Sequence, residues 1–116
     1  MTQAVNQADF DNEVLASSTP VLVDFWADWC GPCHALAPHL ESVEQSLGDR
    51  LKVAKVDVDQ NMPLAQRYGV RALPTLLLFA HGEVIGQQSG ARSAAELQQW
   101  IESQLAEHSS TASPVS

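Results

Sequence analysis

The chain has 116 residues, a length that suits one globular domain with its own hydrophobic core. Apolar residues make up 45% of it, which excludes a wholly disordered chain, and no apolar run approaches the ~20 residues of a membrane span. The short apolar runs predict no membrane partner, and the 6 basic and 14 acidic residues give a net charge of −8, so we expect no nucleic-acid partner.

The first half of the chain predicts a helix, a strand and a longer helix. Apolar residues at helical spacing predict the first helix over residues 9–17, after a short edge strand. Residues 21–27 are almost continuously apolar and rich in β-branched and aromatic types, which is typical of a central strand covered on both faces. In residues 31–47 apolar side chains recur four, three and four positions apart, which predicts a helix ending at Gly48.

The second half predicts strands alternating with shorter helices. Residues 51–58 form a strand pattern, and the polar turn after it leads into a short helix. The strand patterns at 75–80 and 83–88 are separated only by His81-Gly82, which indicates an antiparallel hairpin. Ser93-Ala94-Ala95-Glu96 has the pattern of a capping box and opens the last helix.

This order of elements predicts an α/β fold with one mixed sheet of four or five strands flanked by four helices. We find no internal repeat and no sign of a second domain. The domain is placed at residues 1–107, and the polar residues 108–116 are expected to form a disordered tail.

The only two cysteines, Cys30 and Cys33, lie where the central strand ends and the long helix begins. The free N–H groups and the positive end of the helix dipole favour a thiolate there, so Cys30 is the candidate nucleophile. Cys33 lies one turn further in and is more shielded. Their spacing places both on one helical face, while Gly31 and Pro32 suit a tight first turn. The pair is predicted to open and close reversibly.

Two other interpretations of the cysteines are inert buried thiols and half of a zinc site. Zinc normally takes four ligands, and the nearby His34 and His39 fit badly, because His34 projects about 100° around the helix from Cys33. A cysteine pair of this spacing in an α/β pattern favours redox chemistry over both. We therefore expect no metal and no other cofactor.

Two segments of the chain resemble the thioredoxin family. Residues 23–33, Val-Asp-Phe-Trp-Ala-Asp-Trp-Cys-Gly-Pro-Cys, are similar to its active-site segment, and residues 70–79, Val-Arg-Ala-Leu-Pro-Thr-Leu-Leu-Leu-Phe, to its substrate-facing loop and strand. The resemblance covers about residues 5–106. It implies the thioredoxin fold and a protein-disulfide reductase in which Cys30 forms a mixed disulfide with the substrate and Cys33 resolves it.

Asp24 is the candidate proton acceptor for the resolving step. It interrupts an apolar strand, where desolvation should raise the pKa of a carboxyl group and make it a better base. Lys55 resembles the lysine that neighbours this acid in the family. The alternatives are a structural acid at position 24 and a snorkelling lysine at position 55.

A substrate-docking surface is also implied by the resemblance. An X–Pro bond is usually trans, but the resemblance implies a cis bond at Leu73-Pro74, with backbone beside Cys30 free to pair with an extended substrate. The implied surface consists of Trp29, Gly31, Pro32, Ala72, Leu73, Pro74 and the Gly90-Ala91 loop. His34 departs from the lysine that many family members carry, which leaves partner choice and pH dependence open.

The implied partners are disulfide-containing proteins and a thioredoxin reductase that returns electrons, and we expect a monomer. The first seven residues have neither the basic start nor the apolar stretch of a secretory signal, so we expect a cytoplasmic protein. Two other functions stay open, a non-catalytic binding module and an oxidase or isomerase. By resemblance, the Gly31-Pro32 between the cysteines favours reduction.

Overall fold

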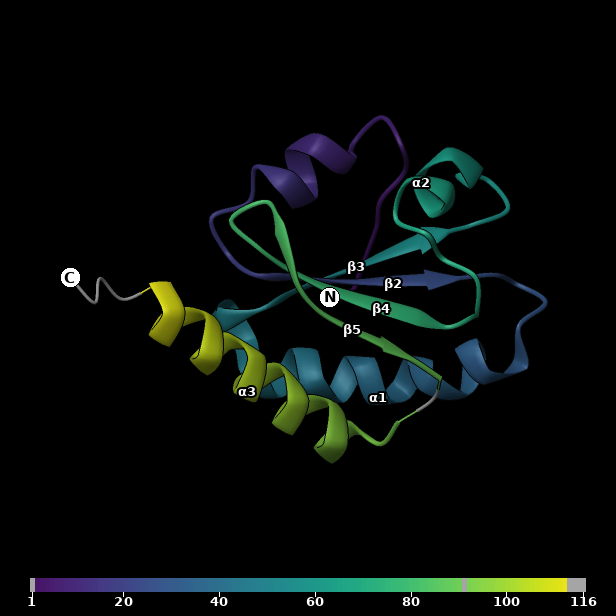
Figure 1. Cartoon of the computed structure of the whole chain (residues 1–116). Helices are drawn as coiled ribbons and strands as arrows, with labels where there is room; N and C mark the ends of the chain where they lie inside the picture. Colours follow the sequence, from purple (N-terminus) through teal and green to yellow (C-terminus); the bar gives the residue numbers. More distant parts are fainter. Residues whose placement is uncertain (1, 91, 113–116) are drawn as a thin grey trace.

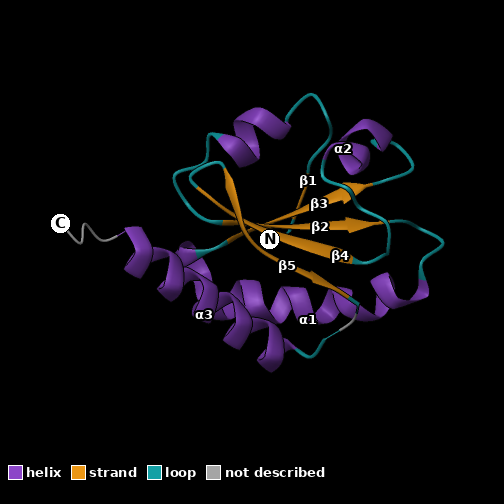
Figure 2. Ribbon diagram, in the orientation of Figure 1, coloured by secondary structure: helices purple, strands orange, loops and turns teal. Residues whose placement is uncertain are grey.

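The computed structural model describes residues 2–90 and 92–112, with side chains as far as His108. They form one five-stranded sheet with helices on both faces (Figures 1 and 2). The strands are β1 (Gln3–Ala4), β2 (Val21–Trp26), β3 (Lys52–Asp57), β4 (Thr75–Ala80) and β5 (Glu83–Ser89). The helices are the π-helix η1 (Asp11–Leu15), α1 (Gly31–Leu47), the 3-10 helix η2 (Gly48–Arg50), α2 (Met62–Arg67) and α3 (Ala94–Ala112).

The sheet is mixed and has β2 at its centre, with the strand order β1-β3-β2-β4-β5. β3 pairs in parallel with β1 and β2. The parallel pairing of β2 with β3 is possible because α1 carries the chain back across the sheet between them. β4 pairs antiparallel with β2 and β5. His81 and Gly82 have φ angles of 52° and 80°, the positive values that a two-residue hairpin turn needs. The predicted mixed architecture and the hairpin are confirmed.

Side chains of β2 alternate between two apolar layers, one on each face of the sheet. On one face, Val23 and Phe25 pack in a cluster with Phe10 near η1 and Leu64 of α2. On the other face, Leu22 belongs to a second cluster formed mainly with side chains of α1 and α3. Figure 1 shows this division, with α1 and α3 below the sheet and α2 above it. Because both faces are covered, β2 is buried along almost its whole length, as its composition predicts.

The helix boundaries agree with the sequence pattern in the middle of the chain and differ at its two ends. The predicted helix at 31–47 is confirmed as α1, and Gly48 follows it. The first helix is shorter than the predicted 9–17 and is π-helical, since bonds such as Ala16 N–H to Asp11 O span five residues. α3 runs to Ala112, beyond residue 107, where the sequence places the end of the domain. Residues 113–116 lie outside the described part.

The last helix lies very close to the edge strand β5. A Cβ atom added at Gly86 of β5 would lie 2.9 Å from a ring carbon of Trp100 in α3, closer than such atoms approach in folded proteins. Trp100 and Leu105 pack against the second apolar cluster, in which Leu97 and Ile101 are fully buried. The absence of a side chain at Gly86 therefore sets how closely α3 can cover the sheet.

No helix in residues 2–90 and 92–112 is long and apolar enough to cross a membrane.

Candidate active site

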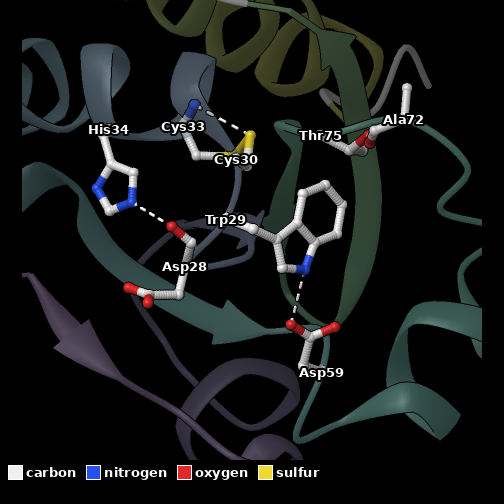
Figure 3. The surroundings of a disulfide bond; sticks show 8 residues. All are labelled: Asp28, Trp29, Cys30, Cys33, His34, Asp59, Ala72 and Thr75. Carbon is white, nitrogen blue, oxygen red and sulfur yellow. Dashed lines mark hydrogen bonds between the residues drawn. A yellow bond between two sulfur atoms is a disulfide. The ribbon is translucent and has the colours of Figure 1, made fainter.

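The two cysteines form a disulfide at the start of α1, beyond the carboxyl end of the central strand (Figure 3). β2 ends at Trp26, a short turn follows, and Cys30 is the N-cap residue of α1 in an extended conformation. The Cα atoms of Cys30 and Cys33 are 5.3 Å apart. Cys30 is 5% exposed and Cys33 2%, so both are buried in the disulfide form and the expected difference in shielding is small.

The sulfur of Cys30 takes the place of a capping oxygen. The backbone N–H of Cys33 donates a hydrogen bond to Cys30 Sγ at 3.1 Å, as the dashed line in Figure 3 shows. No acidic side chain lies in the first turn of α1. No carboxylate therefore competes with the sulfur of Cys30 for the positive end of the helix dipole. This arrangement stabilises a thiolate on Cys30 once the disulfide is reduced.

His34 lies on a different side of α1 from the sulfur atoms. Its Nε2 is 2.7 Å from the carbonyl oxygen of Asp28 (Figure 3). Its ring packs edge-on against Trp26, with the ring centres 6.1 Å apart. The imidazole thus bridges α1 and the turn before it. Among the described residues, no three His, Cys, Asp or Glu side chains are grouped so that they could hold a metal ion.

Asp24 is buried in the centre of the sheet with 1% of its surface exposed. Within the described part of the chain, neither of its carboxylate oxygens accepts a hydrogen bond. Burial raises the pKa of Asp24 to about 6, and the positive charge of Lys55 opposes part of that rise. The desolvation expected from its place in an apolar strand is present, so Asp24 holds a proton at mildly acid pH and gives it up near neutrality.

Lys55 lies directly opposite Asp24 in the parallel register of β2 and β3. Its ammonium group is 4.4 Å from the centre of the Trp26 ring, a cation–π contact. Lys55 is half-buried, so its stem covers apolar surface while its charge stays close enough to act on the carboxyl group of Asp24.

Trp29 projects from the turn before Cys30 and is 70% exposed. Its indole N–H donates a hydrogen bond to Asp59 Oδ2 at 2.8 Å (Figure 3). Sequence reasoning did not select Asp59, because it lies thirty residues away in a polar run that predicts only a turn. No local signal indicated this partner, which becomes visible only when the loops after β2 and β3 are placed side by side.

The segment before β4 lies at the same end of the sheet as the cysteines. The Leu73–Pro74 peptide bond is cis. The backbone N–H of Gly90 donates to the carbonyl of Pro74 at 3.0 Å, and the hydroxyl of Thr75 donates to the carbonyl of Ala72. The structure thus joins four predicted docking residues, Ala72, Leu73, Pro74 and Gly90, in one loop pair. Ala91 lies outside the described residues.

Comparisons with known proteins agree with this site. The thioredoxin family model matches residues 1–103. The chain belongs to the thioredoxin family. It is 48% identical over 101 residues to thioredoxin of Acidithiobacillus ferridurans, covering 87% of this chain and 94% of that protein. It is 49% identical over 88 residues to thioredoxin 1 of Synechococcus elongatus, covering 76% and 82%, and 43% identical over 101 residues to thioredoxin of Rhodospirillum rubrum, covering 87% and 97%.

The five-stranded mixed sheet with helices on both faces is accordingly the thioredoxin fold, as the resemblance implied. The Cys30–Cys33 pair is a redox-active dithiol/disulfide couple. This thioredoxin-family chain is a thiol-disulfide oxidoreductase that reduces protein disulfides through that couple. Disulfide-containing proteins and a reductase are the partners that the family implies in general.

Proposed function

We propose that Cys30 is the attacking residue and Cys33 the resolving residue. The reduced protein presents a Cys30 thiolate, which attacks one sulfur of a substrate disulfide. The substrate's S–S bond breaks, its other sulfur leaves as a thiolate that takes up a proton, and the substrate stays bound to Cys30 through a mixed disulfide. The position of Cys30 Sγ as the acceptor at the N-terminus of α1 supports this order, because only Cys30 is the capping residue.

Cys33 completes the exchange in the proposed mechanism. Its thiol loses a proton and its sulfur attacks Cys30 Sγ, which breaks the mixed disulfide and releases the second substrate thiolate. Two electrons have then passed to the substrate, and the Cys30–Cys33 disulfide is restored. A reductase returns two electrons to start the next cycle, and we propose a thioredoxin reductase for this role.

Asp24 is the proposed proton acceptor for Cys33. A general base is most effective when its pKa lies near the working pH. The buried Asp24, with its pKa raised to about 6, satisfies that condition better than an exposed aspartate. Lys55 is the proposed positioning residue, because its charge limits the rise and so keeps Asp24 ionisable at neutral pH.

The docking surface proposed for substrates surrounds the cysteines. It consists of Trp29, Gly31, Pro32, Ala72, Leu73, Pro74, Gly90 and Ala91. Trp29, Gly31, Pro32 and Ala72 are exposed, which leaves them accessible to a partner. An extended substrate segment lying beside Leu73 would pair with backbone there, as in strand addition.

We also propose that the protein acts as a monomer in the cytoplasm and that residues 1–107 suffice for the fold and the activity. Leu105 of α3 packs against the second apolar cluster, and a chain ended at residue 107 keeps this contact. A chain ended at residue 107 should keep its reduction rate and its monomeric mass in sedimentation.

The observation that carries the proposal is the sulfur cap at the start of α1. Reduction of a disulfide-bonded protein is measured with the parent chain, the Cys30→Ser variant and the Cys33→Ser variant, with and without a thioredoxin reductase. The parent should turn over only with the reductase, and Cys33→Ser should accumulate the mixed disulfide. Mixed disulfide on Cys33 in the Cys30→Ser variant at the same rate would reverse the assignment. A measured reduction potential well above that of a cytosolic reductant would indicate an oxidase.

A further inference from the structure

An open groove runs from the active site toward α2. Its lining is mostly apolar and comes from the turn before Cys30, the loop after β3, α2 and the segment before β4. The lining residues are Trp29, Val58, Met62, Ala65, Gln66, Val70, Arg71 and Leu73. Six of them, Val58, Met62, Ala65, Gln66, Val70 and Arg71, lie outside the docking surface proposed above. The groove therefore extends the reactive centre by a distinct set of side chains.

Two side chains leave large apolar surfaces open in this groove. Trp29 is 70% exposed and Met62 53% exposed, which makes them two of the three large apolar side chains exposed among the described residues. The indole of Trp29 is fixed at its polar edge by Asp59, so its apolar faces stay in place beside the groove. Two such residues lining one groove next to a nucleophile indicate a site for an apolar side chain.

Arg71 gives the groove a positive charge that pairs with no carboxylate in the described part of the chain. The other five cations of the chain each act on one of its own carboxylates, either in an ion pair or through the carboxyl's pKa. These pairs are Arg50–Glu102, Lys52–Glu13, Arg67–Asp11, Lys55–Asp24 and Arg92–Glu96. Arg71 is exposed and makes no ion pair within residues 2–90 and 92–112. On a chain of net charge −8, this guanidinium is a local attraction for an anion.

We propose that this groove selects protein disulfides by the residues next to the reactive cysteine, binding an apolar side chain between Trp29 and Met62 and an adjacent carboxylate at Arg71. The inference rests on the proposed reduction at Cys30 and adds the substrate class that the reaction prefers. A guanidinium pairs with a carboxylate through two parallel N–H donors, so Arg71 fixes the direction of the bound segment as well as its charge.

The test uses short peptides whose single cysteine is linked by a disulfide to thionitrobenzoate, a coloured leaving group. Release of thionitrobenzoate by reduced protein in a single turnover gives the second-order rate constant without any reductase. One peptide series carries Leu-Glu, Leu-Gln, Leu-Lys or Ser-Glu before the cysteine, and a second series carries the same pairs after it. Only the series in which the pair lies on the side of the cysteine that reaches the groove should show a preference. In that series the Leu-Glu peptide should react about 2- to 5-fold faster than the Leu-Gln peptide, the size expected of an exposed charge pair, and the Leu-Lys peptide should react slowest.

Matched variants separate the two halves of the groove. Arg71→Gln should remove the preference for Leu-Glu over Leu-Gln, and Arg71→Glu should reverse it. The control is Arg67→Gln, which removes another exposed guanidinium that is paired with Asp11 and does not line the groove. Met62→Ser should reduce the preference for Leu-Glu over Ser-Glu, whereas Val84→Ser, at the exposed apolar residue on β5, should not. Added salt at 0.5 M should weaken the charge preference and spare the apolar one.

The outcomes distinguish this inference from the reaction on which it rests. Absence of thionitrobenzoate release from every peptide would overturn the proposed role of Cys30. Equal rates for all peptides in both series, or a preference that Arg71→Gln leaves intact, would overturn the groove's selectivity and leave the reductase standing. A fastest rate with Leu-Lys would mean that the overall negative charge of the molecule governs docking and would also overturn the inference.

Discussion

The two long helices of this chain start in different ways. At α3, the hydroxyl of Ser93 accepts from the N–H of Glu96 at 3.2 Å, and the carboxylate of Glu96 accepts from the N–H of Ser93 at 3.0 Å. At α1, the acceptor is Cys30 Sγ, and no carboxylate lies in the first turn. An ordinary helix start satisfies its free N–H groups with oxygen and its dipole with an acid. At α1 the free N–H groups and the positive end of the dipole act on a sulfur atom instead. The cap position of this helix is therefore also the reactive position.

The largest difference between the two starts should appear when each capping side chain is replaced. Cys30→Ser keeps a competent cap, so the free energy of unfolding of the variant should stay within about 1 kcal/mol of the reduced parent. Reduction of protein disulfides should nevertheless fall at least ~1,000-fold, because the hydroxyl cannot replace the thiolate. The two measurements are urea unfolding under reducing conditions and turnover with a reductase. A variant that reduces disulfides at the parent's rate would show that the cap sulfur has no catalytic role.

The start of α1 also differs from that of α3 in having a proposed general base, because Asp24 is the proposed proton acceptor for Cys33. Asp24→Asn should slow release of substrate from the mixed disulfide ~100-fold at pH 7, with a much smaller effect on its formation. Rapid-mixing experiments with a chromogenic disulfide separate the two steps. Equal slowing of both steps would remove Asp24 from the role of base.

The raised pKa of Asp24 also makes a prediction for stability. The folded-state pKa of about 6 exceeds the ordinary value of 3.8, so the protonated form favours the folded state. The stabilisation is full below pH 4 and is lost as pH rises to about 6, a fall of ~3 kcal/mol in the free energy of unfolding. Unfolding of the disulfide form in urea at several pH values should show this fall in the parent and a nearly flat profile over that range in Asp24→Asn. The same slope in both would assign the fall to other groups.

A smaller effect is expected from giving α1 the acid that α3 already has. His34→Glu places a carboxylate near the first turn, where it should disfavour the Cys30 thiolate and slow alkylation by iodoacetamide at neutral pH roughly twofold. His34→Gln is the control, since it removes the same imidazole contact with Asp28 without adding charge. Equal rates in the two variants would show that the helix terminus does not govern the thiolate.

The smallest effect on the chemistry is expected at α3. Ser93→Ala removes one half of the capping box and should lower the free energy of unfolding by ~1 kcal/mol while leaving disulfide reduction unchanged. Thermal unfolding and turnover measure the two quantities. A loss of disulfide reduction in Ser93→Ala would show that the start of α3 influences the active site and does not have a structural role alone.

The sequence was sufficient for these two helix starts because their signals are local. Both Cys30-Gly31-Pro32-Cys33 and Ser93-Ala94-Ala95-Glu96 lie within one turn, so spacing alone predicted where each helix begins. The buried position of Asp24 followed from an apolar run in the same way.

Features that depend on contacts distant in the sequence escaped prediction. The bond between Trp29 and Asp59 joins two loops that only the sheet brings together. Arg71, which has no ion-pair partner among the residues that the structure describes, looks like any surface arginine until the partners of the other cations are known. The π-helical first helix and the extension of α3 to Ala112 likewise have no counterpart in the apolar spacing.

The missing side chain at Gly86 limits how this protein can be engineered. A glycine inside a strand invites replacement by valine or threonine, which favour extended backbone. At Gly86 either substitution would collide with the indole of Trp100. β5 and α3 would therefore have to be redesigned together, with a smaller residue at position 100. Optimising β5 alone would push α3 off the sheet and loosen the domain at the edge that it was meant to strengthen.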